Sequence, residues 1–210
     1  MKVVAFNGSP RPQGNTYMAL RTVADVLEKH GIEVEIIQVG DKPIHGCAAC
    51  NACVKNRDGR CALPDDGVNE WIRKMAEADG ILLGTPVYFA GLSGTMKSFL
   101  DRAFFVAGNN GSLRHKVGAA VAAVRRTGGI PAMDALNHYI AYSEMVMPTS
   151  NYWNVVHGMK PGEVEQDAEG IQCMQVLGEN MAWLMKLMEY GKDAVPAPEA
   201  VRKRFTNFIR

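Results

Sequence analysis

Short apolar runs separated by helix-length segments constrain the fold of this chain more than any other feature. Residues 2–6, 80–84 and 117–124 are almost entirely apolar or small, which is typical of strands buried on both faces of a parallel sheet. Residues 32–39 alternate apolar with polar side chains and predict a strand near a sheet edge. We expect a fifth strand within residues 146–156.

Helical patterns occupy the segments between these runs. Apolar residues recur at i, i+3, i+4 and i+7, and five helices are predicted: one after residue 16, one opening at Asp65 and Asp66, one around 96–103, and two spanning 132–142 and 168–190. Strands that alternate with helices predict the α/β class, a three-layer α/β/α sandwich around a five-stranded parallel sheet. Ligands of such sheets bind beyond the carboxyl ends of the strands.

The loop at residues 8–16, between the first strand and the first helix, has the composition of an anion site. It contains Gly8, Ser9, Arg11, Gly14, Asn15 and Thr16. Glycines let backbone N–H groups converge, and the helix that follows offers its positive N-terminus. A plain turn capped by Asn15 or Thr16 is the alternative, but the arginine and the two hydroxyls favour a phosphate. The loop matches neither the Rossmann nor the Walker A pattern.

Two further loops follow predicted strands and carry unusual residues. Residues 85–93 include Tyr88 and Phe89, which either contact a flat ring system or cap the core. Residues 125–129 include Gly128 and Gly129, which let the backbone approach a ligand, and Arg125 or Arg126 could stabilise a negative charge. Because the three loops should meet at one edge of the sheet, they predict a phosphate at one end of a site and a planar heterocycle at the other.

Four of the five cysteines fall within fifteen residues of a long irregular segment, 40–64. Connections of this length are uncommon and usually functional. The pattern is Cys-x2-Cys-x2-Cys-x7-Cys, formed by Cys47, Cys50, Cys53 and Cys61. This spacing is typical of iron–sulfur ligation, whereas zinc sites normally use two separated Cys-x2-Cys pairs. Zinc and free thiols remain the alternatives.

Composition excludes several classes of function. The net charge of +1 gives no argument for nucleic acid or an anionic membrane as a partner. No stretch approaches the ~20 apolar residues of a membrane-spanning helix, and the first apolar run is too short for a signal peptide. We therefore expect a cytoplasmic protein, in which clustered cysteines indicate metal or redox chemistry rather than structural disulfides.

The three loops, taken with residues 93–97, Asp101-Arg102, Tyr152-Trp153 and Gly158, resemble the flavodoxin-like NADPH-dependent FMN reductase superfamily over residues 1–190. The resemblance implies a sheet of order 2-1-3-4-5 and bound FMN. It implies that the FMN phosphate is bound by Ser9, Arg11, Asn15 and Thr16, with Gly14 in the same loop. It implies that the isoalloxazine ring lies against Pro86, Val87, Tyr88, Phe89, Thr127, Gly128 and Gly129. Arg126 is a candidate to stabilise the reduced, anionic flavin.

The cysteine pattern is similar to that of the iron–sulfur flavoprotein subgroup of this superfamily. That resemblance implies a 4Fe–4S cluster on the four cysteines, carried by the insertion at 40–64 of a domain at 1–190 that precedes a tail at 191–210. It also implies a homodimer or homotetramer that brings the cluster of one subunit towards the flavin of another.

The implied activity is an FMN-dependent oxidoreductase that takes electrons from NAD(P)H and reduces a quinone, a flavin or a similar small-molecule acceptor. The alternative is an electron carrier between a ferredoxin-like protein and FMN. No catalytic side chain is expected, because the flavin supplies the chemistry.

Overall fold

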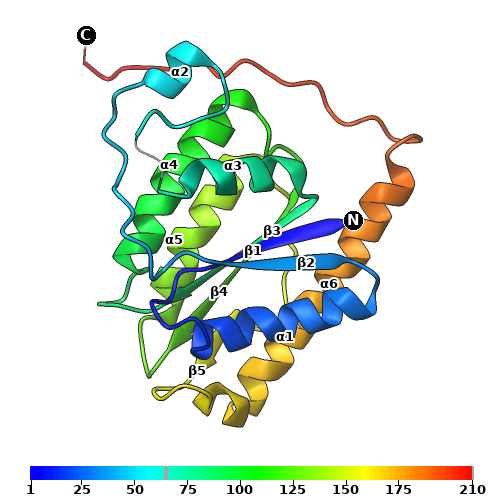
Figure 1. Cartoon of the computed structure of the whole chain (residues 1–210). Coiled ribbons are helices and arrows are strands. Elements are labelled where there is room, and N and C mark those ends of the chain that lie inside the picture. The colour runs from blue at the N-terminus through cyan, green and yellow to red at the C-terminus, as the bar shows by residue number, and fades with distance from the viewer. Residues whose placement is uncertain (64–65, 210) are drawn as a thin grey trace.

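The computed structural model describes residues 1–63 and 66–209. Its core is one five-stranded parallel sheet of order β2-β1-β3-β4-β5 (Figure 1). The strands are β1 (Lys2–Asn7), β2 (Glu33–Gln38), β3 (Gly80–Pro86), β4 (Val117–Val124) and β5 (Val155–His157). All eight residues of β4 are buried, as expected for a central strand. The predicted fold class and strand order are confirmed.

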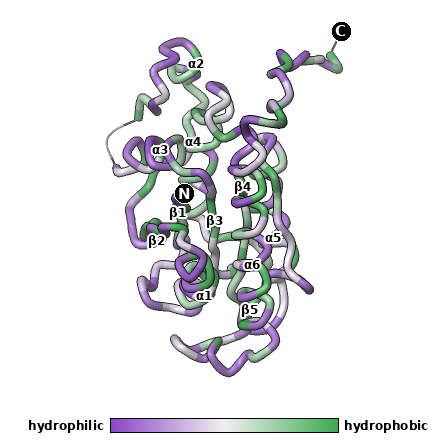
Figure 2. Tube along the Cα trace, turned by 90° about the vertical axis from the view of Figure 1, so that its right-hand side faces the viewer, coloured by the Kyte–Doolittle hydropathy of each residue, from purple (hydrophilic) through white to green (hydrophobic). Residues whose placement is uncertain are grey.

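Helices cover both faces of the sheet (Figures 1 and 2). One face is covered by α1 (Asn15–Lys29) and α6 (Ala168–Gly191), which is preceded by the short 3-10 helix η1 (Glu163–Gln166). The other face is covered by α3 (Val68–Glu77), α4 (Gly94–Asn110) and α5 (Gly129–Tyr142). Each layer buries its own apolar core against the sheet, so the three-layer sandwich is also confirmed.

Two predicted helix starts are wrong. Asp66 lies before α3, which begins at Val68 after a left-handed Gly67 with φ +89°, and Asp65 lies outside the described residues. The helix expected at 132–142 begins three residues earlier, at Gly129. Pro131 falls in its first turn, where a missing backbone N–H removes no helical hydrogen bond.

The short elements depart most from the sequence pattern. β5 has only three residues, because within the predicted window 146–156 Val146 makes a single bridge to Val117 and the chain leaves the sheet until Val155. Helix α2 (Ala52–Asn56) was not predicted. It spans five residues between Asn51 and Arg57, both left-handed, and so few residues show no helical period.

Among the described residues no helix is both long enough and apolar enough to cross a membrane. The tail after α6 extends away from the end of that helix (Figure 1). It touches the domain where Arg114 donates to the Glu199 carbonyl at 3.0 Å and where the Lys203 ammonium lies 3.7 Å from the centre of the Tyr142 ring.

Candidate functional site

The three strand-end loops meet at the carboxyl edge of the sheet. The Gly8 amide donates to the Gly84 carbonyl at 2.8 Å, and the Ser93 hydroxyl donates to the Gly8 carbonyl at 2.7 Å. A Cβ added at Gly128 would lie 2.8 Å from the Ala90 Cα, so the loop after β4 packs directly on the loop after β3. The expected convergence of the loops is confirmed.

Two amide side chains behind the 8–16 loop fix its shape. Asn7 accepts from the Ser9 amide at 3.1 Å and donates to the Gln38 side chain at 2.6 Å. Gln38 in turn donates to the Ser9 carbonyl at 2.7 Å. Sequence reasoning missed both residues, although a polar Asn7 directly after an apolar run was a usable signal in the sequence. In the structure Asn7 ends β1 and is fully buried.

Sequence reasoning also missed Gly40, a position with no space for a side chain. A Cβ there would lie 2.3 Å from the carbonyl carbon and oxygen of Ser9, far inside van der Waals contact. The chain leaving β2 therefore presses its backbone against the back of the loop, which only glycine allows.

Helix α1 begins without a side-chain cap. Its N-cap residue is Gly14, and the Asn15 side chain instead accepts from the Gly162 amide at 3.0 Å, 147 residues along the chain. The alternative of a plain turn capped by Asn15 or Thr16 is therefore wrong. Uncapped N–H groups at a helix N-terminus bind anions well. A buried Ser9 and an exposed Arg11 lie in the loop, and Thr16, also buried, is the second residue of α1. The loop fits a phosphate group.

The loop after β3 is a tight hairpin that projects its aromatics outward. Tyr88 and Gly91 exchange both backbone hydrogen bonds, at 2.9 and 3.0 Å. The two residues between them, Phe89 and Ala90, are left-handed with φ of 48° and 58°, a conformation that is costly for residues other than glycine. Tyr88 is 49% and Phe89 fully exposed, so neither caps the core.

A cavity of about 360 Å³ lies beside the loop after β4. Its walls include Arg126 and the backbone of 127–129, together with Tyr152, Trp153 and His157. The His157 ring lies 3.3 Å from a carboxylate oxygen of Asp167. Three of the predicted ring contacts, Thr127, Gly128 and Gly129, thus border a space with aromatic walls together with Arg126, which suits a flat ligand.

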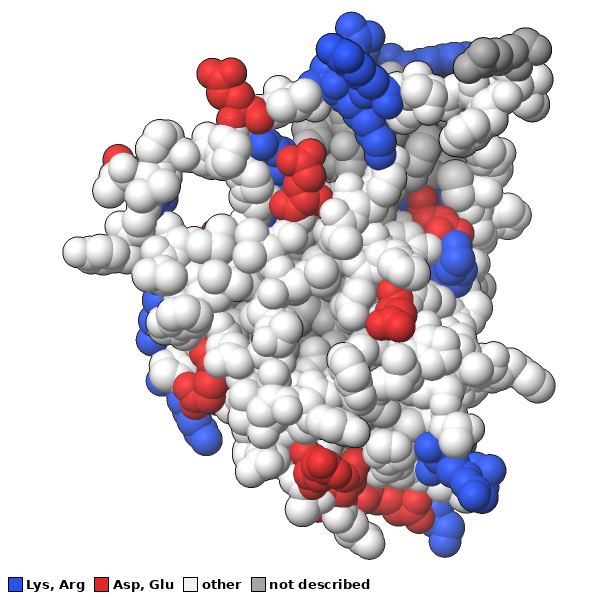
Figure 3. All heavy atoms as spheres, turned by 180° about the vertical axis from the view of Figure 1, so that it is seen from behind, with Lys and Arg blue, Asp and Glu red and all other residues white. Residues whose placement is uncertain are grey.

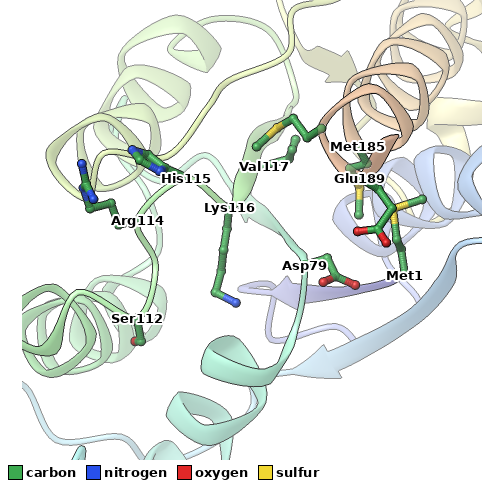
Figure 4. Close-up of a pocket in the computed structure, with 10 residues that line it drawn as sticks. Met1, Asp79, Ser112, Arg114, His115, Lys116, Val117, Met185 and Glu189 are labelled. Carbon is green, nitrogen blue, oxygen red and sulfur yellow. The ribbon is translucent and has the colours of Figure 1, made fainter. Parts of the chain in front are cut away.

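Another cavity, of about 280 Å³, lies at the opposite, amino edge of the sheet (Figure 4). Lys116 donates to the Ala76 carbonyl at 2.9 Å and contacts the Ala78 carbonyl, so it caps the C-terminus of α3. Burial lowers the pKa of the Lys116 ammonium below its ordinary value. This cavity is distant from the three loops, and its partly buried Lys116 stabilises the end of α3.

The four clustered cysteines border one small cavity beside the second half of α4, whose wall includes Arg102 and Phe105. Cys47 and Cys50 are exposed, and Cys53 and Cys61 are partly buried. Within residues 1–63 and 66–209 no three His, Cys, Asp or Glu side chains are grouped to hold a single metal ion. A 4Fe–4S cluster is held by four cysteine thiolates, and all four of the clustered cysteines border this one cavity.

Arg102 joins this cavity to the domain. Its Nε donates to the Cys61 sulfur at 3.3 Å, and its Nη1 contacts the Asp66 carboxylate and donates to the His45 carbonyl at 3.2 Å. Partial burial opposes ionisation of Asp66, but the ion pair with Arg102 outweighs it and keeps the pKa of Asp66 below its ordinary value. Asn69 makes two hydrogen bonds with the Cys61 backbone, at 2.8 and 3.0 Å.

The two candidate sites lie at different points along α4. Ser93, its N-cap, touches the 8–16 loop, whereas Arg102 lies nine residues further on. At 1.5 Å per residue that separation is roughly 13 Å along the helix axis. Within one chain, the cysteine cavity is therefore set back from the carboxyl edge of the sheet.

A 2-1-3-4-5 sheet with a glycine-bearing anion loop at its carboxyl edge defines the flavodoxin-like class of proteins. The family model for NADPH-dependent FMN reductase matches residues 1–160, and the chain belongs to that family. The predicted class of an FMN-dependent oxidoreductase is confirmed by this membership.

Individual proteins support the same assignment. An iron–sulfur flavoprotein of Methanocaldococcus jannaschii is 37% identical over 90% of this chain and 100% of its own length. An FMN reductase (NADPH) of Pseudomonas putida is 26% identical over 90% of this chain and 81% of its own. The solved structure of RosB superposes with a TM-score of 0.69 at 18% identity, over 100% of this chain and 94% of that one, which supports the fold.

Proposed function

We propose that this chain transfers electrons from NADPH through FMN to a quinone, a flavin or a similar small acceptor in the cytoplasm. The observation that carries the proposal is the uncapped start of α1, tied by Gly8 and Ser93 to the loops that would surround a ring. Bound FMN would accept hydride and store two electrons, while the chain binds and orients it.

The residues assigned to FMN form two groups, one at the phosphate end of the site and one at the ring end. The phosphate is bound by Ser9, Arg11, Gly14, Asn15 and Thr16. The ring lies against Pro86, Val87, Tyr88, Phe89, Thr127, Gly128 and Gly129, with Arg126 beside it. Charge-assisted hydrogen bonds from an arginine suit a phosphate, and Arg126 stabilises negative charge on the reduced ring. Hydride transfer needs no protein acid or base, so no side chain is assigned a catalytic role.

The cysteines Cys47, Cys50, Cys53 and Cys61 hold a 4Fe–4S cluster in this proposal. Its support is the shared cavity and relatives at up to 37% identity that are named iron–sulfur flavoproteins. A second candidate function, electron carrier between a ferredoxin-like protein and FMN, is favoured by the exposure of Cys47 and Cys50, because an exposed cluster edge is accessible to a protein donor.

Within one chain the cysteine cavity is set back from the flavin edge. A homodimer or homotetramer would bring the cluster of one subunit towards the flavin of another. The face over α5 carries few charges in Figure 3. Its exposed apolar side chains are Ile130, Tyr142, Val146, Met147, Tyr152 and Trp153. The tail at 191–210 lies outside the proposed domain at 1–190 and contacts that domain at Arg114 and Tyr142. Sedimentation of the purified protein measures the subunit number, and a monomer would contradict this assignment.

Anaerobic purification tests the two functions together. The absorption spectrum, iron, acid-labile sulfide and bound FMN are measured, and the protein is then titrated with NADPH and NADH. We expect FMN with about four irons per chain and reduction by NADPH. A flavin-only protein without iron would exclude the carrier function. A cluster-bearing protein that neither nicotinamide reduces would exclude the reductase function.

A further inference from the structure

Arg102 is a buried cation that the described residues do not fully satisfy. It lies on α4 with 1% of its surface exposed. Among the described residues its one carboxylate partner is Asp66, which is itself partly exposed. Burying an arginine in a helix that packs on the sheet is costly unless the charge and all its donors find partners, so its surroundings need explanation.

The hydrogen bonds of Arg102 to the described residues involve only two of its three guanidinium nitrogens. Its Nε and Nη1 are bound to Cys61, His45 and Asp66. Its Nη2 is buried and has no hydrogen-bond partner among the described residues. Buried N–H donors without a partner are rare in native proteins, and a cationic donor is especially costly to leave unpaired.

The cavity beside this guanidinium is the one bordered by the four cysteines. A 4Fe–4S cluster on four thiolates carries net negative charge, and hydrogen bonds to its sulfurs together with nearby charge set its reduction potential. Such a cluster would place further negative charge beside the guanidinium, whose Nη2 has no hydrogen-bond partner among the described residues. The bond to Cys61 shows that the guanidinium already reaches one of the four sulfurs.

We propose that Arg102 is a positioning residue of the cluster: it orients the Cys61 thiolate and raises the potential at which the cluster accepts one electron. The proposal rests on the cluster of the proposed function. Reduction adds one electron, supplied by FMN that NADPH has reduced, and neither forms nor breaks a bond. The fixed positive charge stabilises the more negative, reduced cluster relative to the oxidised one.

Asp66 acts in the opposite sense. Its carboxylate neutralises part of the Arg102 charge, so replacing it by an amide of the same shape leaves more of that charge to act on the cluster. Arg60 provides the matched control, because it is adjacent in sequence to Cys61 but solvent-exposed, and an exposed charge is screened by water and salt.

The experiment uses the full-length protein, purified anaerobically as wild type and as Arg102→Gln, Arg102→Lys, Asp66→Asn and Arg60→Gln. Iron and FMN are counted, and the cluster is titrated electrochemically with its EPR signal as the readout. Arg102→Gln is expected to lower the ratio of reduced to oxidised cluster about tenfold at a given potential, a shift of ~59 mV for one electron. Arg102→Lys should lower the reduction potential less, Asp66→Asn should raise it, and Arg60→Gln should leave it unchanged.

An iron-loaded Arg102→Gln protein with the wild-type potential would overturn the role of Arg102 and leave the cluster in place. If Arg102→Gln fails to fold or loses its iron, the Asp66→Asn titration decides: an upward shift supports the proposal and an unchanged potential overturns it. Wild-type protein without iron overturns both the cluster and the role of Arg102, whereas retained FMN and reduction by NADPH keep the flavin function.

Discussion

The 8–16 loop and the cysteine segment at 41–63 both carry the residues assigned to a cofactor, but the chain fixes their shapes by different means. The loop is clamped by Asn7 and Gln38 and backed by Gly40. The cysteine segment exposes two of its four thiols and makes one five-residue helix.

The two regions differ in whether their order depends on a bound cofactor. A loop held by buried hydrogen bonds to two strands has its shape before any ligand arrives, so FMN binds a preformed site. A segment with few buried contacts gains most of its order from a group that ties several side chains together. The cluster should therefore stabilise its own segment, while FMN binding should be nearly independent of it.

Cys50→Ser gives the largest expected effect. Replacing one of four thiolates removes a ligand that the cluster requires, so iron should fall to near zero while FMN remains at wild-type occupancy. Iron and flavin are counted in the same anaerobic sample. Cys173→Ser is the control, because Cys173 is buried in α6 away from the other four, and it should keep its iron. Loss of FMN along with iron in Cys50→Ser would contradict the independence of the two regions.

Removal of the cluster by a chelator should expose the cysteine segment to trypsin. Lys55, Arg57 and Arg60 are exposed basic residues within it, and cleavage there should accelerate at least tenfold, because local opening sets the rate of proteolysis. Fragments are identified by mass spectrometry, and FMN fluorescence reports the flavin site. Equal cleavage rates with and without iron would show that the segment is ordered by the chain itself.

Arg11→Ala tests the preformed loop. Loss of a charge-assisted contact to the phosphate should weaken FMN binding by ~1.5–3 kcal/mol, roughly 10- to 150-fold. The dissociation constant is measured by flavin fluorescence. Arg202→Ala, an exposed arginine in the tail and away from the three loops, is the control. An unchanged affinity for Arg11→Ala would refute the phosphate role.

Gly40→Ala tests the same loop from behind. The added methyl group cannot fit against Ser9, and overpacking of this kind costs about 1–3 kcal/mol, so FMN affinity and Tm should both fall. Gly108→Ala is the control, because its Cβ would meet no atom within 4 Å. Wild-type FMN affinity in Gly40→Ala would show that the loop adapts rather than being fixed.

Ala90→Gly gives the smallest expected change. Relief of a left-handed alanine in the hairpin should raise the free energy of unfolding by up to ~1 kcal/mol, measured by urea denaturation. Gly94→Ala, with no atom within 4 Å of the added Cβ, is the control for a change in unfolded-chain entropy. A loss of stability in Ala90→Gly would mean that the Ala90 side chain matters more for packing than for strain.

The sequence predicted the parts of the molecule that depend on local pattern. Central strands are apolar throughout, and apolar side chains recur every three to four residues in the long helices. Both kinds of element could therefore be predicted without knowing what they pack against. The glycines and hydroxyls of the 8–16 loop likewise predict an anion site from the local sequence alone.

The contacts that shape the two sites could not be predicted, because they join distant positions. Gln38 reaches Ser9 across 29 residues, and Arg102 reaches Cys61 across 41. The sequence pattern assigned Arg102 to a family motif without indicating its partner. Helix α2 and β5 were also missed or misplaced, because elements of three to five residues are determined by their surroundings rather than by period.

The cysteine segment connects the end of β2, where Gly40 packs on the 8–16 loop, to α3. A connection of a few residues normally joins a strand to a helix, so this segment is far longer than the connection requires. Deletion of residues 41–63 would leave Arg102 without Cys61 and His45, however, and an apolar residue would then be favoured at that position. Arg102 therefore depends on the cysteine segment for two of its three hydrogen-bond partners, Cys61 and His45.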